Sequence, residues 1–201
     1  MSTRQKHKTF LTADPHWGHF NIIEYTQRPF HTLDQMHETM QRNWNSRVTD
    51  DDTVINVGDW CFKNSPGGKT GEGLPITADY WASQLRGKKI FIKGNHDRNN
   101  SLVTPIGGLL LETHGRKIYC VHKPEHANLN YEINFVGHVH DRWLIRQCQG
   151  TILFNVGVDQ HRFMPITIDE ALGQIQRLKR TTTIQEFTLS ERNSTDTTRS
   201  Q

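Results

Sequence analysis

Five apolar runs in this sequence are each followed closely by side chains that can bind a metal ion. Carboxylate, amide and imidazole groups of this kind suit Mn, Fe, Zn, Ni and Co. Seven such ligands are too many for one tetrahedral ion, but a carboxylate shared between two ions would account for all of them. The pattern therefore predicts a two-metal centre. In chain order the ligands are Asp14 and His16 (after TFLTA), Asp59 (after TVINVG), Asn95 (after KIFIKG), His122 (after KIYCV), and His138 and His140 (after EINFVG).

The apolar runs themselves are short and rich in Val, Ile and aromatic residues, which is typical of β-strands. Their apolarity is continuous rather than alternating, which indicates strands covered on both faces. In an α/β sheet the loops at the carboxyl ends of the strands converge on one crevice, so the ligands are expected to meet there. We predict strands at residues 9–13, 53–57, 89–93, 118–121, 133–136 and 151–156.

Three stretches between and after these strands have helical spacing of apolar residues. A helix is predicted over residues 33–48, where Thr32 and Gln35 form a capping box, and another over 78–86, capped by Thr77. A third follows Asp169. Gly58, Gly94 and Gly137 directly precede ligands, and we interpret them as sharp bends between strand and loop.

One stretch, His122-Lys123-Pro124-Glu125-His126, also matches the H-x-x-E-H pattern of a class of zinc peptidases. That pattern needs a helix, so that both imidazoles face one ion. Pro124 lacks a backbone N–H and disfavours helix at Lys123, and an apparent strand leads into the motif. Of the residues in this stretch, we therefore expect only His122 to be a metal ligand.

Composition limits the class of protein. The chain has 201 residues, 24 Lys and Arg against 21 Asp and Glu, and a net charge of +3, which is too weak to indicate nucleic-acid binding by itself. Three dispersed cysteines do not form a disulfide framework, and no apolar run has membrane-spanning length. We expect a cytoplasmic protein without membrane contacts. We expect one domain, residues 1–180, followed by a Ser- and Thr-rich tail, residues 181–201. The tail is predicted to be largely disordered apart from a short strand at about residues 184–189.

At this point the sequence resembles a known family. D-x-H (Asp14, His16), G-D (Asp59), G-N-H-D (Asn95 to Asp97), a single His (His122) and G-H-x-H (His138, His140) match, in order, the signature of the calcineurin-like metallophosphoesterases. The match spans roughly residues 8–170. Stretches such as HWGHFNII and NVGVDQHRFMPI are similar to the short stand-alone members of bacteria and bacteriophages, and a phage origin would place the protein in the host cytoplasm.

The resemblance implies an α/β fold, a four-layer αββα sandwich of two mixed sheets flanked by helices. It also implies how the ligands divide. Asp59 would bridge two divalent ions, with Asp14, His16 and His140 on one, and Asn95, His122 and His138 on the other. We expect manganese for activity, although Fe, Zn, Ni or Co fit the same ligands. His96 would protonate the leaving oxygen, and Asp97 would orient the His96 imidazole. The alternative is that Asp97 caps the next turn.

Further residues near the motifs are candidates for substrate binding. Arg28 has the geometry to hold a phosphate bidentately, and its alternative is a surface ion pair in a structural turn. Lys123 and Arg142 flank ligands, and a solvated face explains them equally well. The full set of candidates is His19, Asn21, Arg28, Lys123 and Arg142.

These observations lead to a prediction of function. We expect an enzyme that hydrolyses phosphodiester or phosphomonoester bonds of a small, nucleotide-like substrate by attack of a metal-activated hydroxide. A nuclease acting on DNA or RNA is the alternative, disfavoured by the low charge. A non-catalytic protein-binding scaffold is less favoured still, because no ligand and no catalytic His is missing.

Overall fold

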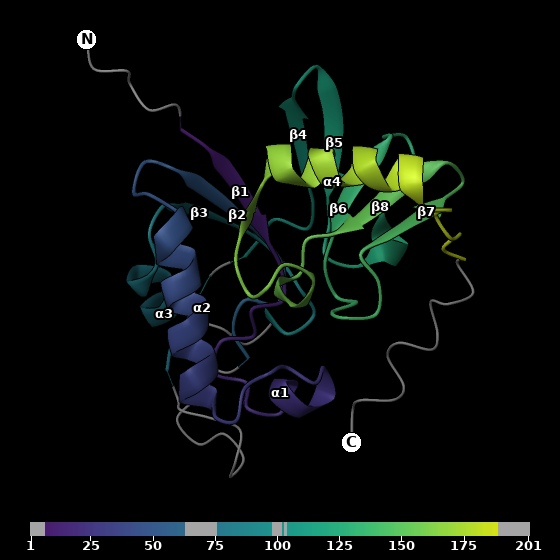
Figure 1. The fold of residues 1–201 in the computed structure, drawn as a ribbon. Coiled ribbons are helices and arrows are strands. Elements are labelled where there is room, and N and C mark those ends of the chain that lie inside the picture. The colour runs from purple at the N-terminus through teal and green to yellow at the C-terminus, as the bar shows by residue number, and fades with distance from the viewer. Residues whose placement is uncertain (1–6, 63–75, 98–101, 103, 189–201) are drawn as a thin grey trace.

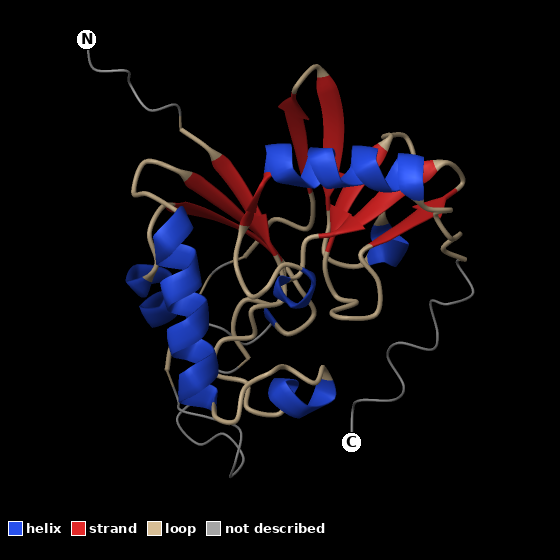
Figure 2. Ribbon diagram, in the orientation of Figure 1, coloured by secondary structure: helices blue, strands red, loops and turns tan. Residues whose placement is uncertain are grey.

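Two mixed β-sheets form the centre of the computed structural model, which describes residues 7–62, 76–97, 102 and 104–188 (Figures 1 and 2). The first sheet has the strand order β3 (Lys88–Ile92), β2 (Thr53–Val57), β1 (Thr9–Thr12), β9 (Ile166–Thr167). The second has the order β4 (Leu109–Thr113), β5 (Arg116–Cys120), β6 (Ile133–Val136), β8 (Thr151–Asn155), β7 (Ile145–Cys148). Strands β1, β2 and β3 run parallel, as do β5, β6 and β8, while β9, β4 and β7 are antiparallel to their neighbours.

The helices lie around these sheets. They are α1 (Ile22–Tyr25), α2 (Leu33–Arg47), α3 (Ala78–Gln84) and α4 (Ile168–Thr181), with short 3-10 helices η2 (Pro124–His126) and η3 (Val158–Gln160). Figure 1 shows α2 and α3 beside the first sheet and α4 crossing the second. Among the described residues, no helix combines the length and apolarity that a membrane span requires.

Strand alternation divides the core into layers. On β1, Phe10 packs with the apolar faces of α2 and α3, whereas Leu11 points into the core between the two sheets. On the second sheet, Ile118 faces Leu11 across that core, and α4 adds Ile175 to it. This packing of two mixed sheets and helices agrees with the predicted fold class.

The sequence located the parallel strands more closely than the edge strands. β2 and β6 have the predicted bounds, and β1, β3, β5 and β8 differ from prediction by one or two residues at an end. The strands that the sequence missed are β4, β7 and β9, all antiparallel and on the outside of a sheet or very short. Strand β4 alternates half-buried with exposed residues, so it lacks the continuous apolar pattern used to find the others.

The helix caps follow the predicted chemistry. The Thr32 hydroxyl accepts a bond from the Gln35 N–H and the Thr77 hydroxyl accepts one from the Tyr80 N–H, which confirms both as N-caps. The Gln35 side chain, however, accepts from the His31 N–H, one residue before the cap. A complete capping box forms instead at Thr167 and Glu170, at the start of α4.

The chain after α4 pairs with β7 inside the segment where a short strand is expected, with a bridge between Gln147 and Glu186. Gln147 at the outer edge of β7 bonds to both Gln185 and Phe187 through backbone groups, at 3.0 and 2.6 Å. Phe187 is 6% exposed and packs with Val121 and Leu153. Covering an edge strand in this way hides its free N–H and C=O groups. The remainder of the predicted tail, residues 189–201, lies outside the described residues.

A buried histidine connects α2 to the loop after β1. The Nε2 atom of His37 accepts a 3.0 Å bond from the N–H of Gly18, and its ring packs against Trp17 and Trp81. Burial lowers the pKa of His37 to about 4, although Asp34 acts in the opposite direction. The neutral ring thus holds the segment that carries Asp14 and His16 against the helix.

This contact predicts a pH dependence of stability. Because the folded pKa is depressed, the stability contributed by neutral His37 is complete above about pH 6.5 and is lost as the pH decreases toward 4. Between these values the metal-free wild type should lose roughly 3 kcal/mol more unfolding free energy than His37→Asn. Urea titrations in chelator would measure this difference. His31→Asn, at an exposed position just before α2, is the control. Parallel pH profiles for wild type and His37→Asn would contradict this account.

Candidate metal centre

The predicted ligands meet where the carboxyl ends of the two sheets adjoin. Two groups have one ligand atom from each residue within 4.8 Å of the others: Asp14, His16 and His140, and Asp59, His122 and His138. Each group combines residues from both sheets. In the first sheet, Asp14 and His16 follow β1 and Asp59 follows β2. In the second, His122 follows β5, and His138 and His140 follow β6. These groups correspond to the division that the resemblance implied, but with Asp59 in one group only and without Asn95; metal binding by them stays a prediction. We call these the Asp14 group and the Asp59 group.

Backbone bonds hold the two sheets together at this edge. The Val158 N–H donates to the Ala13 carbonyl at 3.0 Å, and Ala13 and Gly157 form an isolated parallel bridge. Within the first sheet, the Asp14 N–H donates to the Gly58 carbonyl at 3.1 Å. The loops that carry ligands therefore have fixed positions relative to one another.

The backbone of the ligand loops is unusual. Asp14, His16, Asp59, His138 and His140 have φ angles of 56°, 50°, 53°, 70° and 49°. This left-handed region is uncommon for residues other than glycine, and each such residue costs on the order of 1 kcal/mol. Strain of this kind persists only where the surrounding structure imposes it, and it is frequent at functional sites.

The glycines beside the ligands serve two purposes. Gly58 has a φ of 94° and makes the predicted bend before Asp59. At Gly94 the reason is close packing instead, because a Cβ atom there would lie 2.2 Å from the backbone nitrogen of Asp59. Gly137 is similar: its Cβ would lie 2.8 Å from an Asp14 carboxylate oxygen. The predicted bend is thus the reason for glycine only at Gly58.

His122 is oriented from behind by a backbone carbonyl. Its Nδ1 atom lies 2.8 Å from the Val57 oxygen, which can only accept, so the ring donates through Nδ1. Its Nε2 atom lies 3.2 Å from Asp59 and 3.1 Å from the Asn95 side-chain oxygen. Asn95 thus lies next to the Asp59 group, as predicted. His126 is exposed at the end of η2, which agrees with reading the peptidase pattern as a coincidence.

Unpaired polar atoms show that the residues fit a metal ion. The Asp14 Oδ1 atom and both ring nitrogens of His16 are buried and have no hydrogen-bond partner among the described residues. The His16 Nε2 atom lies 3.6 Å from Asp59 and 4.0 Å from Asp14. Buried polar groups are normally paired, so the unpaired His16 Nε2 and Asp14 Oδ1 atoms, 4.0 Å apart, fit two ligands of one ion.

Burial and neighbouring charges shift the pKa values of several predicted ligands. Burial raises the pKa of Asp14 to about 6. Burial also opposes ionisation of Asp59, but His122 and His16 hold its pKa well below the ordinary range. For His122, burial favours the neutral ring, yet Asp59 and Asp14 raise its pKa to about 10. Burial lowers the pKa of His138 to about 3, with the neighbouring His122 acting in the same direction. The carboxylates of Asp59 and Asp14 thus favour the charged form of His122.

His96 lies at the open side of this cluster. Its backbone N–H donates to Asp59 at 2.9 Å, its side chain is exposed, and its ring centre is 5.3 Å from that of His16. An exposed imidazole at this place can reach an atom bound over the ligands. The predicted role of His96 as a proton donor remains a prediction.

The Asp97 carboxylate binds backbone groups near Asp59. Its carboxylate accepts from the backbone N–H groups of Asp59, Trp60 and Gly94, at 2.9, 2.9 and 2.8 Å. These bonds fasten the loop after β3 to the loop after β2. They give Asp97 a role in placing Asp59, while orienting His96 remains a prediction.

The candidate substrate residues are distributed unevenly. His19 is buried beside His16 and stacks on Phe62, with ring centres 3.7 Å apart. Asn21 precedes α1 as its N-cap residue and is half-buried. The Lys123 side chain is half-buried and lies 3.8 Å from Glu125, whereas Arg142 is exposed. Their roles toward a substrate stay predictions.

Arg28 requires a correction. It is 4% exposed, and its guanidinium donates to Asp159, to the Asp14 and Pro15 carbonyls and to the Met36 sulfur. These bonds use all five N–H groups, so none remains for a phosphate. The ion-pair alternative is the correct one, but the pair is buried rather than on the surface. Asp159, its partner, was missed by the sequence analysis, although it follows the sixth predicted strand as the ligands follow the other five.

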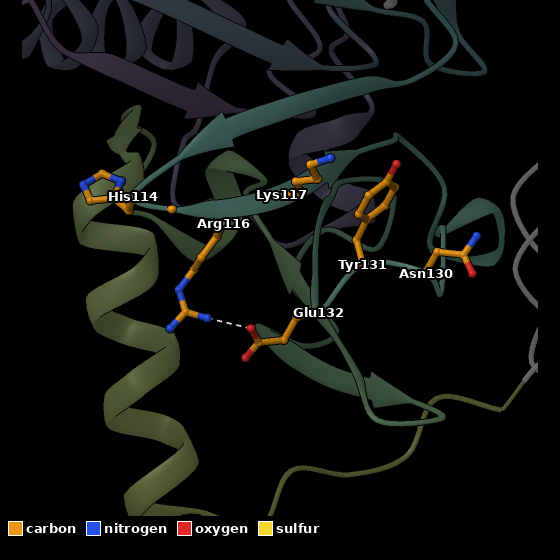
Figure 3. A pocket seen from close by; sticks show the side chains of 7 residues that line it. His114, Arg116, Lys117, Asn130, Tyr131 and Glu132 are labelled. Atoms are coloured by element: carbon orange, nitrogen blue, oxygen red, sulfur yellow. Dashed lines mark hydrogen bonds and ion pairs between the residues drawn. The ribbon is translucent and has the colours of Figure 1, made fainter.

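A separate hollow lies away from the ligands, at the amino ends of β5 and β6 (Figure 3). It has a volume of about 510 Å³, and its cations are already paired: Arg116 with Glu132 at 2.6 Å and Lys117 with Glu112 at 3.4 Å. It contains none of the predicted ligands, so it is not the metal centre. Its lining is His114, Gly115, Arg116, Lys117, Asn130, Tyr131 and Glu132.

Comparisons with known proteins place the fold. No protein-family model matches the chain. An uncharacterized protein of Methanocaldococcus jannaschii is 29% identical over 190 residues, which cover 90% of this chain and 98% of that one. The crystal structure of a protein of unknown function from Aquifex aeolicus matches with 18% identity and a TM-score of 0.61, over 85% of this chain and all of that one.

More distant matches include YfcE, a phosphoesterase from E. coli, at 16% identity and a TM-score of 0.37, over 75% of this chain and 78% of that one. The likeness to the Aquifex protein shows a shared fold and says nothing of activity. The chain therefore shares the fold of that protein, and the motifs by which it resembles the calcineurin-like metallophosphoesterases lie together where its own two sheets adjoin.

Proposed function

We propose that this protein is a metal-dependent phosphoesterase that hydrolyses phosphodiester, or phosphomonoester, bonds of a small nucleotide-like substrate. One observation carries the proposal: two three-residue ligand groups lie side by side, with Asp59 within 3.6 Å of ligand atoms from both. When bound, a pair of divalent ions supplies an activated water and neutralises phosphoryl oxygens. Oxygen and nitrogen ligands accommodate Mn, Fe, Zn, Ni or Co, and manganese is our choice for activity.

The chain's own residues would divide the remaining work. Asp14, His16 and His140 would hold one ion, while His122, His138 and Asn95 would hold the second. His96, exposed beside His16, would hold a proton on its imidazole and pass it to the leaving oxygen. Asp97 would keep Asp59 in place through its backbone bonds.

Two stacked aromatic rings, those of His19 and Phe62, adjoin the proposed site. His19 stacks on Phe62, and Phe62 lies 5.8 Å from His96 between ring centres. Flat apolar surfaces of this kind suit an aryl or nucleobase group on a substrate. The nuclease alternative would need a basic, aromatic strip along the surface, and no comparable observation supports it within the described part of the chain.

Metal binding is expected in a ratio of two ions to one chain. Equilibrium dialysis against Mn²⁺ should give about two ions per wild-type chain and raise the melting temperature by roughly 5–10 °C at a hundredfold excess over Kd. Asp59→Asn, which removes the shared carboxylate, should lose most of both effects. Binding of less than one ion per wild-type chain would contradict the two-metal reading.

Turnover is expected first with diesters. Protein loaded with Mn²⁺ should hydrolyse bis-p-nitrophenyl phosphate, and p-nitrophenyl phosphate should be the slower substrate. Release of p-nitrophenolate measures both reactions directly. The proposal fails if neither compound is turned over with Mn²⁺, Fe²⁺, Zn²⁺, Ni²⁺ or Co²⁺.

His96→Ala should separate metal binding from chemistry. Its side chain belongs to neither ligand group, so we expect the bound manganese to stay near two ions per chain. Turnover should decrease by about a hundredfold or more, as for loss of a positioned acid. His126→Ala, another exposed histidine, is the matched control and should behave as wild type. Unchanged turnover of His96→Ala would remove this residue from the mechanism.

A further inference from the structure

Behind the Asp14 group lies a buried ion pair that no motif predicted. Asp159, in η3, accepts from Arg28 at two points: its Oδ1 atom lies 2.8 Å from Nε and its Oδ2 atom 3.0 Å from Nη2. The same Oδ2 atom lies 3.1 Å from the Nδ1 atom of His140. One carboxylate therefore connects a buried guanidinium to a predicted metal ligand.

Arg28 also reaches the other side of the Asp14 group. Its Nη2 atom donates to the Asp14 carbonyl at 2.8 Å and its Nη1 atom to the Pro15 carbonyl at 3.1 Å. These two residues belong to the loop after β1, whereas His140 belongs to the loop after β6. Arg28 and Asp159 together thus connect the segments that supply Asp14 and His140.

The bond to Asp159 also selects the tautomer of His140. An ionised carboxylate can only accept, so the proton of the ring must be on Nδ1, which leaves the lone pair of Nε2 free for a metal ion. The two carboxylate oxygens of Asp159 each accept a bond from the buried Arg28 guanidinium, and this paired cation keeps the carboxylate ionised. In the Asp59 group, the same task at His122 is done by the uncharged Val57 carbonyl.

We propose that Asp159, anchored by Arg28, is a positioning residue for one ion only, the ion held by Asp14, His16 and His140. This inference rests on the proposed two-metal function and identifies the residues that position the ligands of one of the two ions. The two ligand groups are supported differently: His140 is oriented by a buried charged pair, whereas His122 is oriented by a backbone carbonyl. Damage to the pair should therefore empty one site and leave the other filled.

Asp159→Asn is the test. The shape is kept, but an amide nitrogen facing Nδ1 would donate to it and force the proton of His140 onto Nε2, the atom that must bind metal. We expect Mn²⁺ affinity at one site to decrease by about ten- to a hundredfold, with the second site unchanged. Dialysis at intermediate Mn²⁺ should then give about one ion per chain. The electron paramagnetic resonance spectrum should change from a coupled pair to an isolated Mn²⁺ signal.

Two further variants separate positioning from stability. Glu170→Gln breaks another Arg–carboxylate pair, with Arg47, and weakens the capping box of α4 far from the ligands. It should lower the melting temperature and leave two ions bound. Arg28→Lys retains the charge but loses the fork, so it should weaken the same single site as Asp159→Asn, by a smaller factor.

A measurement on the wild type covers the case in which the variants do not fold. Long-range ¹H–¹⁵N spectra of the Zn²⁺-loaded protein should show His140 protonated on Nδ1. A proton on Nε2, equal weakening of both sites in Asp159→Asn, or two ions bound with wild-type affinity would each overturn the inference. Because these readouts are metal binding and tautomer, they stand even if no phosphoester is hydrolysed. Failure to bind any metal in wild type would instead refute the proposed function.

Discussion

The junction between the carboxyl ends of the two sheets is the constraint on which the site depends. The Val158 N–H bonds to the Ala13 carbonyl there, and the His122 ring bonds across to Val57. Since each ligand group draws residues from both sheets, neither could form if the sheets separated. The core between the sheets, from Leu11 to Phe154, is thus what brings seven polar side chains into one small volume. Burial of that apolar area supplies the free energy that offsets crowding of like charges.

The crowding is visible in strained backbone angles and in buried polar atoms that have no partner in the described part of the chain. Left-handed φ angles occur at Asp14, His16 and Asp59, and the buried atoms of His16 have no partner among the described residues. A stable fold avoids both features where nothing requires them. Supports around the ligands compensate in part: Asp97 fastens the loop of Asp59, and Arg28 with Asp159 fastens the loops of Asp14 and His140. The site is best described as preorganised, with its ligands held in place by neighbours rather than by the ion alone.

The sequence indicated which candidate ligands lie together because these residues follow buried parallel strands, whose continuous apolar pattern is strong and local. It missed β4 and β7, since half-buried edge strands lack that pattern. It also misassigned Arg28, because an arginine beside a motif looks the same whether it faces a substrate or a carboxylate distant in the chain. Asp159 lies 131 residues from Arg28, and only the packed structure shows that they meet. Contacts of such range depend on how the two sheets dock, which no local pattern records.

The central claim is that two ions occupy the place where the sheets adjoin, one in each ligand group. Anomalous diffraction from crystals soaked in Mn²⁺ tests it most directly. The account predicts two peaks about 3.5–4 Å apart, one within reach of Asp14, His16 and His140, the other within reach of His122 and His138, with Asp59 between them. A single peak, or manganese bound elsewhere on the protein with both groups empty, would contradict it.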